Sequence, residues 1–293
     1  MKLLVGLSAD QGGREALALS QVLSRSCKAS IVVCTVIPDT WGYPSPARVD
    51  GEYGAFLRQH AARIQEKAKG ALPPDIHADF VVVSAPSARE GLLQVASDVG
   101  ADCLVVGSTR AAPLGRFGEG RVTTDVLRSA HLPVAVAPRG YPLHTRAQLR
   151  RLSCASGGGS NSPKLARRCA ELAQSMNVPM RLVTLVVRDK QMYPSVAGYD
   201  AENIISNAWR EQARDSQAVL IDQWDSPVAV SGEIGDGDTW KAAFDSLLWA
   251  NAELLVVGSS NLGPLLRVFL GSNAIKIVHN SPVPCLILPR ESE

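Results

Sequence analysis

The chain has 293 residues, of which 46% are hydrophobic and 20% charged, with a formal net charge of +2 at pH 7. This composition is that of an ordinary globular protein of about two domains, and its scattered lysines and arginines give no case for a nucleic-acid or membrane surface. The six cysteines form no C-x-x-C pair, no apolar run reaches the roughly 18 residues of a membrane span, and the N-terminal apolar run is too short for a signal segment, so we expect a cytoplasmic protein with reduced thiols.

The first half of the chain alternates short apolar runs with amphipathic segments. The apolar runs, which we interpret as strands, cover residues 2–7, 31–37, 80–83, 103–106 and 134–137. Between them, apolar residues recur at helical spacing and predict helices over residues 16–26, 56–69 and 88–97, with a fourth opening after Gly120. Nearly continuous apolar strands are typical of parallel sheets that are buried on both faces.

The second half repeats this order after a predicted linker, residues 140–148. Its predicted strands are residues 152–155, 181–187, 228–230, 254–257 and 285–288, and its predicted helices are residues 163–176, 201–224 and 240–250, with one more after Gly271. Residues 235–238, Gly-Asp-Gly-Asp, are expected to form a polar turn that caps the third helix. The alternation predicts an α/β protein with two doubly wound domains, residues 1–140 and 149–293, each a five-stranded parallel sheet flanked by helices.

An internal repeat supports this division. Glycines and prolines of the stretch from residue 101 to 139 recur within residues 254–290, each at a separation of 151 residues and without a gap. The matched pairs include Gly107 with Gly258, Gly120 with Gly271, and Pro133 with Pro284. Chance similarity between amphipathic segments would not preserve this register, so we infer a duplication.

The later copy has the layout of a phosphate-binding turn. An apolar strand stops at Gly258, a loop of turn-forming residues follows, and Gly271-Ser272-Asn273 opens a helix. The first N–H groups of a helix lack partners within the helix, and the helix dipole adds positive charge there, so these residues would hold an anion. The Ser272 hydroxyl would bind phosphate or help to hold Mg²⁺. The alternative is that Gly258 only ends a strand and Ser272 only caps the helix.

These motifs resemble those of a tandem universal stress protein, over nearly the whole chain. The family motif is Gly, two residues, Gly, nine residues, Gly, then Ser or Thr. The C-terminal copy matches it with Gly258, Gly271 and Ser272 and departs only at Asn261. The N-terminal copy keeps Gly107 and Gly120 but has Arg110 and Arg121 at the other two positions. The resemblance implies an adenine nucleotide alpha hydrolase-like fold in each half.

The resemblance also implies a function. The protein would bind ATP or a related adenine nucleotide with Mg²⁺, mainly in its C-terminal half, and act in the stress response as a non-catalytic, nucleotide-dependent interaction module. The implied site residues are Gly258, Asn261, Gly271, Ser272, Asn273, Ser156, Leu185 and Val257. A weaker second site would involve Gly107, Gly120, Ser8 and Val36. Ser8 and Ser156 stand where the family usually has an Asp that holds the nucleotide.

The resemblance further implies that the two halves pair through their last strands as a pseudo-dimer within one chain. The protein partner is unknown, and a further homodimer stays open. Two other functions also stay open. One is an interaction module that has lost nucleotide binding. The other is an adenylating enzyme, since residues 156–162, Ser-Gly-Gly-Gly-Ser-Asn-Ser, faintly resemble a PP-loop. The sequence contains no histidine pair, nucleophile elbow or paired-carboxylate motif. Slow ATP hydrolysis or autophosphorylation is the most that the family resemblance implies.

Overall fold

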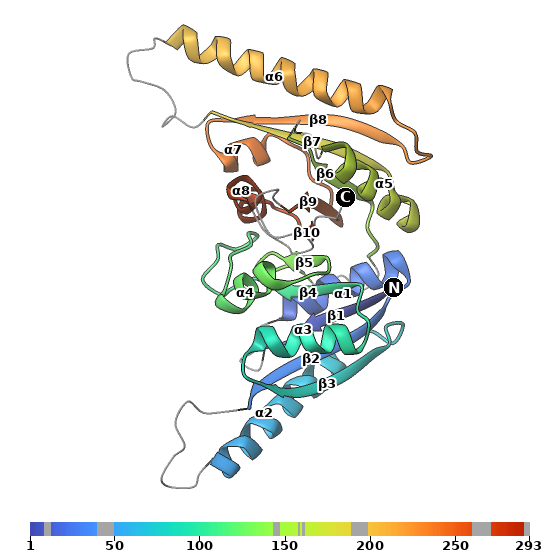
Figure 1. Cartoon of the computed structure of the whole chain (residues 1–293), viewed down its shortest axis with the longest axis vertical. Coiled ribbons are helices and arrows are strands. Elements are labelled where there is room, and N and C mark those ends of the chain that lie inside the picture. Colours follow the sequence, from blue (N-terminus) through green and yellow to red (C-terminus); the bar gives the residue numbers. More distant parts are fainter. Residues whose placement is uncertain are drawn as a thin grey trace. The chain divides into compact units, whose positions relative to one another are not determined.

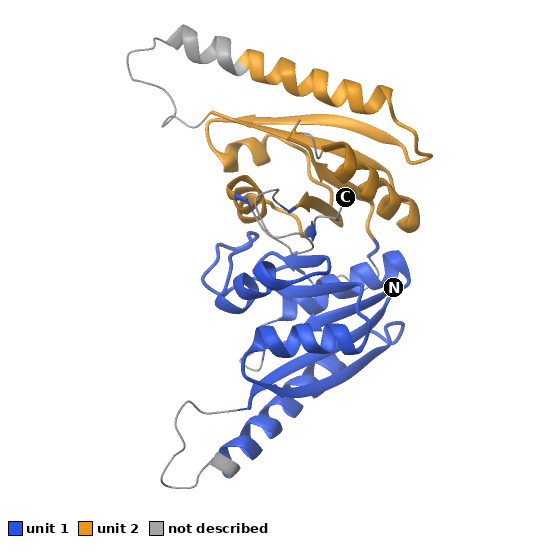
Figure 2. Cartoon of the chain, in the orientation of Figure 1, with its two compact units in different colours: residues 1–148, 259–271, 286–293 blue, residues 149–258, 272–285 orange. Residues whose placement is uncertain are grey.

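A computed structural model of the chain describes residues 1–8, 13–39, 50–142, 147–157, 159, 162–188, 199–259 and 271–289, with the backbone alone described at residues 50–51 and 199–206. The chain divides into two compact units (Figure 2). Unit 1 contains residues 1–148, 259–271 and 286–293, and unit 2 contains residues 149–258 and 272–285. No helix in the described part of the chain is both long enough and apolar enough to span a membrane.

The N-terminal half alternates strands with helices (Figure 1). Its strands, in the spatial order β3-β2-β1-β4-β5, are β1 (Lys2–Gly6), β2 (Ser30–Pro38), β3 (Ala78–Ala85), β4 (Cys103–Gly107) and β5 (Val134–Ala137). Its helices are α1 (Arg14–Cys27), α2 (Asp50–Gly70), α3 (Ala88–Asp98) and α4 (Arg121–Ser129). β1 pairs in parallel with β2 and β4, β2 with β3, and β4 with β5. The chain thus winds outward in both directions from β1, as the sequence predicts.

The C-terminal half repeats this order of elements. Its strands, in the order β10-β9-β6-β7-β8, are β6 (Arg151–Ala155), β7 (Met180–Val187), β8 (Val230–Gly237), β9 (Glu253–Gly258) and β10 (Cys285–Leu288). Its helices are α5 (Ser162–Met176), α6 (Tyr199–Asp222), α7 (Trp240–Asp245) and α8 (Ser272–Asn280). β6 pairs in parallel with β7 and β9, and β7 with β8. The predicted α/β class is therefore confirmed.

The sequence prediction was wrong about β8. We expected a strand at residues 228–230 and a capping turn at residues 235–238, but the strand runs from Val230 to Gly237. Its glycines let α7 pack directly on it, because a Cβ at Gly235 would lie 2.4 Å from the carbonyl oxygen of Ala243. The side chain that caps α7 is that of Thr239, whose Oγ1 accepts from the N–H of Ala242 at 3.1 Å.

The third predicted helix is also shorter than expected. α7 ends at Asp245, whereas apolar residues at helical spacing continue to residue 250. Trp249 Nε1 donates to the carbonyl of Phe244 at 2.8 Å, and the Ser246 hydroxyl donates to that of Ala243 at 2.9 Å. Ser246 Oγ also accepts from the N–H of Asp236 at 3.0 Å. These side chains use the carbonyls that a continuing helix would need.

A buried charge cluster joins the amino ends of the strands in unit 2. The Arg181 guanidinium is fully buried, and its Nη2 lies 2.9 Å from Oε1 of Glu253, which is also fully buried. Glu253 also accepts hydrogen bonds from Ser153 Oγ, from Arg151 Nη2 at 2.7 Å and from the N–H of Ala250 at 2.8 Å. Arg181 Nη1 pairs with a second carboxylate, Glu233 Oε2, at 2.5 Å. The ring of Trp249 lies 4.6 Å from the Arg181 Cζ atom. Because both charges have several partners, their burial is tolerated.

A glutamine holds the second helix against the sheet in each half. Gln65 of α2 donates to Thr35 Oγ1 on β2 at 3.4 Å and to the carbonyl of Val81 on β3 at 2.7 Å. Gln217 of α6 donates to Thr184 Oγ1 on β7 at 2.9 Å and to the carbonyl of Glu233 on β8 at 3.0 Å. The two glutamines therefore occupy equivalent places, which fixes the correspondence between α2 and α6.

Candidate functional site

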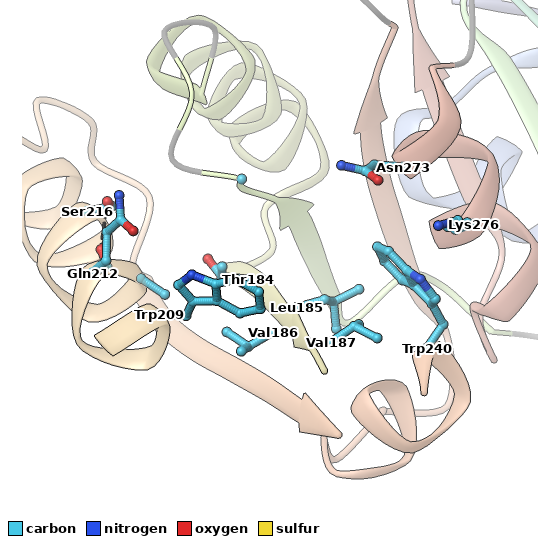
Figure 3. A pocket seen from close by; sticks show the side chains of 12 residues that line it. Thr184, Leu185, Val186, Val187, Trp209, Gln212, Ser216, Trp240, Asn273 and Lys276 are labelled. Atoms are coloured by element: carbon cyan, nitrogen blue, oxygen red, sulfur yellow. Dashed lines mark hydrogen bonds between the residues drawn. The ribbon is translucent and has the colours of Figure 1, made fainter. Parts of the chain in front are cut away.

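A cavity of about 400 Å³ lies in unit 2, where β6 and β7 reach their carboxyl ends (Figure 3). Open parallel sheets bind ligands at this edge, beside the strand from which the chain winds both ways, which is β6 here. The volume falls in the range of small-molecule sites, about 300–1,000 Å³. The cavity is lined by Gly157, Thr184, Leu185, Val186, Val187, Trp209, Gln212, Ala213, Ser216, Trp240, Asn273 and Lys276.

One part of the cavity is apolar and aromatic. Val186, which is 6% exposed, and its neighbours on β7 supply aliphatic surface. Trp209 reaches toward them from α6, and Trp240 opens α7 on the other side of the same β7 residues in this view (Figure 3). Both tryptophans are half-buried and line the cavity. Flat aromatic surface beside aliphatic side chains suits the apolar faces of a heterocyclic ring.

The other part of the cavity is polar and cationic. Asn273 and Lys276 are exposed side chains in the first turns of α8, which begins at Ser272. Lys276 Nζ lies 5.8 Å from the centre of the Trp240 ring, within the range of a cation–π contact. The lysine charge and the positive end of the α8 dipole act in the same direction. This part of the cavity therefore favours an anion.

Ser156 supplies a buried hydroxyl next to the cavity. It follows β6 and precedes the lining residue Gly157, and its N–H donates to the carbonyl of Val183 at 2.8 Å. The residue is 5% exposed, and its Oγ has no hydrogen-bond partner in the described part of the chain. A buried hydroxyl without a partner carries a free-energy cost, which a bound polar ligand would remove.

The residues predicted from the sequence are only partly gathered at this cavity. Leu185 and Asn273 line it. Val257, at 2% exposure, is buried in β9, and Gly258 ends that strand, where a Cβ would lie 3.3 Å from the side chain of Leu165 on α5. The space at Gly258 thus serves the packing of α5 on the sheet.

The predicted phosphate-binding turn is described only at its two ends, residues 258–259 and 271–273. Gly271 is half-buried, and Ser272 is the exposed first residue of α8. Asn261 lies outside the described residues, as do Gly158, Ser160 and Asn161 of the turn compared with a PP-loop. The roles of these residues stay predictions.

Two arginines that directly follow cavity-lining residues in the chain form ion pairs with aspartates. Arg188 follows the lining residue Val187, and its Nη2 lies 3.0 Å from Asp238 Oδ1. Arg210 follows the lining residue Trp209, and its Nη2 lies 2.5 Å from Asp236 Oδ2. These pairs tie α6 and the end of β7 to the end of β8. The two aspartates, which sequence reasoning treated as a capping turn, therefore hold arginines.

The corresponding loop of the N-terminal half, residues 108–119, is closed on itself. The N–H of Gly118 donates to Ser108 Oγ at 2.9 Å, and the N–H of Thr109 donates to the carbonyl of Gly118 at 3.0 Å. Phe117 is buried at 3% exposure. Arg139 Nη1 donates to the carbonyl of Ala112 at 2.7 Å. Amides that are used within the loop cannot also bind phosphate without breaking these bonds.

The residues predicted for the second site, in the N-terminal half, have separate structural roles. Gly107 ends β4, and a Cβ there would be in ordinary van der Waals contact with the backbone of Gly13, at 3.6 Å. Gly120 is the N-cap of α4, and no side chain caps that helix. Val36 packs against Gly91 of α3, and Ser8 is exposed after β1. Arg121 takes the hydroxyl position and is exposed.

Sequence reasoning missed the contribution of α6. Trp209, Gln212, Ala213 and Ser216 recur at a spacing of three to four residues, so they share one helix face. That spacing was visible in the sequence, but it does not by itself show which strand the face meets. Trp240 was likewise visible only as the start of a helix.

The described residues offer this site neither a cluster of metal-binding side chains nor a cysteine among the cavity lining. No group of three or more His, Cys, Asp or Glu side chains placed to hold a metal occurs in the described ranges. All six cysteines are free thiols. Burial raises the pKa of Cys34, Cys103 and Cys285 to about 12, so these thiols stay protonated near neutral pH.

Comparison with known proteins places the chain in a family. The model of the universal stress protein family matches twice, over residues 1–138 and 149–289. A universal stress protein of Mycobacterium tuberculosis is 36% identical over 292 residues, which cover 99% of this chain and 100% of the relative. A universal stress protein of Mycobacterium bovis shows the same identity and coverage.

Solved structures show the same fold at low identity. A universal stress protein from Archaeoglobus fulgidus aligns with a TM-score of 0.59 at 17% identity, covering 99% of this chain and 97% of that structure. A universal stress protein from Pseudomonas aeruginosa aligns with a TM-score of 0.57 at 14% identity, covering 98% and 92%.

Proposed function

Because the chain belongs to the universal stress protein family, with one family domain in each half, we propose that it binds an adenine nucleotide in its C-terminal domain. The ligand would be ATP or a related nucleotide. The observation that carries this proposal is the cavity beside β6 and β7, which joins aromatic and aliphatic surface to a cationic helix start. These are the two surfaces that a base and its phosphates require.

The residues present fit such a ligand at three points. Trp209 and the β7 side chains offer apolar contact to the base. Asn273 and Lys276 stand at the start of α8, where phosphates are favoured. The hydroxyl of Ser156, which is buried and has no hydrogen-bond partner among the described residues, would hydrogen-bond to the polar edge of the base or to the ribose. Mg²⁺ would be held through the phosphates with help from Ser272.

The N-terminal domain is a poorer site on the same criteria. Its loop at residues 108–119 uses its own amides, and Arg121 replaces the hydroxyl at the start of α4. We therefore assign nucleotide binding mainly to residues 149–289. The N-terminal domain would act as an interaction module, which is the second candidate function and is favoured there by the closed loop.

The nucleotide would act as a signal rather than as a substrate. The described residues around the cavity include no catalytic constellation, and the arginines nearest in sequence are held by Asp236 and Asp238. Binding would change the surface that the C-terminal domain presents to a protein partner in the stress response. We further propose that the two domains form a pseudo-dimer within the chain by pairing of β5 and β10 in a cytoplasmic protein.

Calorimetric titration of MgATP tests this function with a matched pair of variants. Gly271→Asp places a carboxylate at the start of α8, where it would repel phosphate and weaken binding by on the order of 10-fold. Gly120→Asp makes the equivalent change at the start of α4 and is expected to leave the affinity unchanged. Equal affinities in all three proteins, or no binding by the wild type, would contradict the proposal.

A further inference from the structure

The correspondence between the two halves shows how α6 differs from α2. Gln65 and Gln217 occupy equivalent places against their sheets. Trp209 lies eight residues before Gln217, and the residue eight before Gln65 is Leu57. Ala213 and Ala61, each four residues before its glutamine, are both buried, at 8% and 0% exposure, which supports the register.

Counting back from Gln217 and Gln65 in the same way gives the α2 residues that correspond to the other cavity residues of α6. Gln212 corresponds to His60, and Ser216 corresponds to Ile64, which is buried at 8% exposure. The cavity face of α6 thus has a tryptophan, an amide and a hydroxyl where α2 has leucine, imidazole and isoleucine. The core contacts have been kept while this one face has changed. Packing against the sheet does not require this change, because α2 packs in the other half with Leu57, His60 and Ile64 at the same positions.

We propose that Trp209 is the stacking platform for the nucleobase and that it makes the C-terminal domain select a nucleotide over phosphate alone. This inference rests on the proposed function and names the residue that sets its specificity. Trp240 is faced by Lys276 and stands with it at the α8 side of the cavity, whereas Trp209 stands on the α6 side (Figure 3). The base would stack on the Trp209 ring on the α6 side of β7, where Val186 also lies, with the phosphates toward α8.

The hydrogen bonds near Trp209 leave acceptors for the edge of the base. The Ser216 hydroxyl donates to the carbonyl of Gln212 at 2.7 Å, so its oxygen is left to accept. The Gln212 side chain is exposed at the same face and offers both a donor and an acceptor. Stacking supplies most of the binding, and these groups orient the ring.

The experiment compares two ligands across four proteins by calorimetry: MgATP and inorganic triphosphate with Mg²⁺. The proteins are wild type, Trp209→Leu, which installs the residue of the N-terminal half, Trp209→Phe, and Trp224→Phe as a control beyond the cavity. Loss of base stacking predicts ATP affinity roughly 10-fold weaker in Trp209→Leu and within about threefold of wild type in Trp209→Phe. Triphosphate affinity is expected to be the same in all four proteins.

Tryptophan fluorescence gives a second reading of the same contact. ATP is expected to quench the wild type and Trp224→Phe and to lose most of this effect in Trp209→Phe, while melting temperatures show that the variants are folded. If Trp209→Leu binds ATP as tightly as wild type, or weakens ATP and triphosphate equally, the stacking proposal is overturned while nucleotide binding stands. If the wild type binds no ATP, both proposals fail.

Discussion

Replacing Lys276 by Ala tests the cationic end of the cavity. Its Nζ is exposed and stands near the start of α8, 5.8 Å from the centre of the Trp240 ring. An exposed charge in water interacts with a phosphate charge 4 Å away by about 1 kcal/mol, which corresponds to about fivefold in affinity. The effect should shrink as salt rises, because exposed charges are screened within roughly 10 Å at 0.1 M salt.

The assay is titration with MgATP at low and high salt, with adenosine as a ligand without phosphate. Lys276→Ala is expected to weaken ATP about fivefold at low salt and to leave adenosine unchanged. Lys241→Ala is the matched control, because Lys241 is another exposed lysine beside Trp240, ion-paired with Asp245 and absent from the cavity lining. An equal loss in both variants, or an equal loss for adenosine, would refute a direct contact between Lys276 and phosphate.

Three further predictions concern the framework around the site. Glu253→Gln should lower the free energy of unfolding by about 1–3 kcal/mol in urea, because it removes the fully buried one of the two carboxylates that pair with Arg181 and leaves the partly exposed Glu233; a loss below about 0.5 kcal/mol would contradict this. Gly237→Ala should cost about 1–3 kcal/mol by displacing α7, since its Cβ would lie 2.5 Å from the N atom of Ala243, and an unchanged melting temperature would argue against that contact. Iodoacetamide at pH 8 should label Cys27 first, because the other five thiols are buried. Three of these, Cys34, Cys103 and Cys285, have a pKa of about 12 and form almost no thiolate below pH 10. Equally fast labelling of Cys103 or Cys285, detected by mass spectrometry, would count against this.

Much of the fold was accessible from the sequence because its strands are buried on both faces. β4 and β9 are continuous apolar runs that end in glycine, and their repetition in register revealed the two halves before any coordinates. β8 was missed because its sequence, VSGEIGDG, has the residues of a turn. Those glycines are needed for the close approach of α7, which is a tertiary requirement that local propensity does not express.

The candidate site was predictable only where it depends on local geometry. The start of α8 at Ser272 follows from the glycine before it and the apolar spacing after it. The contribution of Trp209 depends on how α6 is seated against β7, which Gln217 fixes through contacts with two strands. The closure of the loop at residues 108–119 depends on a hydrogen bond between Ser108 and Gly118. These residues are ten positions apart, and no sequence pattern indicates that they are in contact.

Photo-crosslinking with an azido analogue of ATP tests most directly whether the C-terminal domain holds the nucleotide. The labelled peptides would be mapped by mass spectrometry, with excess ATP as competitor. We expect competable label on peptides from β7 or α6, including the segment with Trp209, and none on residues 1–138. Competable label confined to residues 1–138, or label that ATP does not displace, would contradict it.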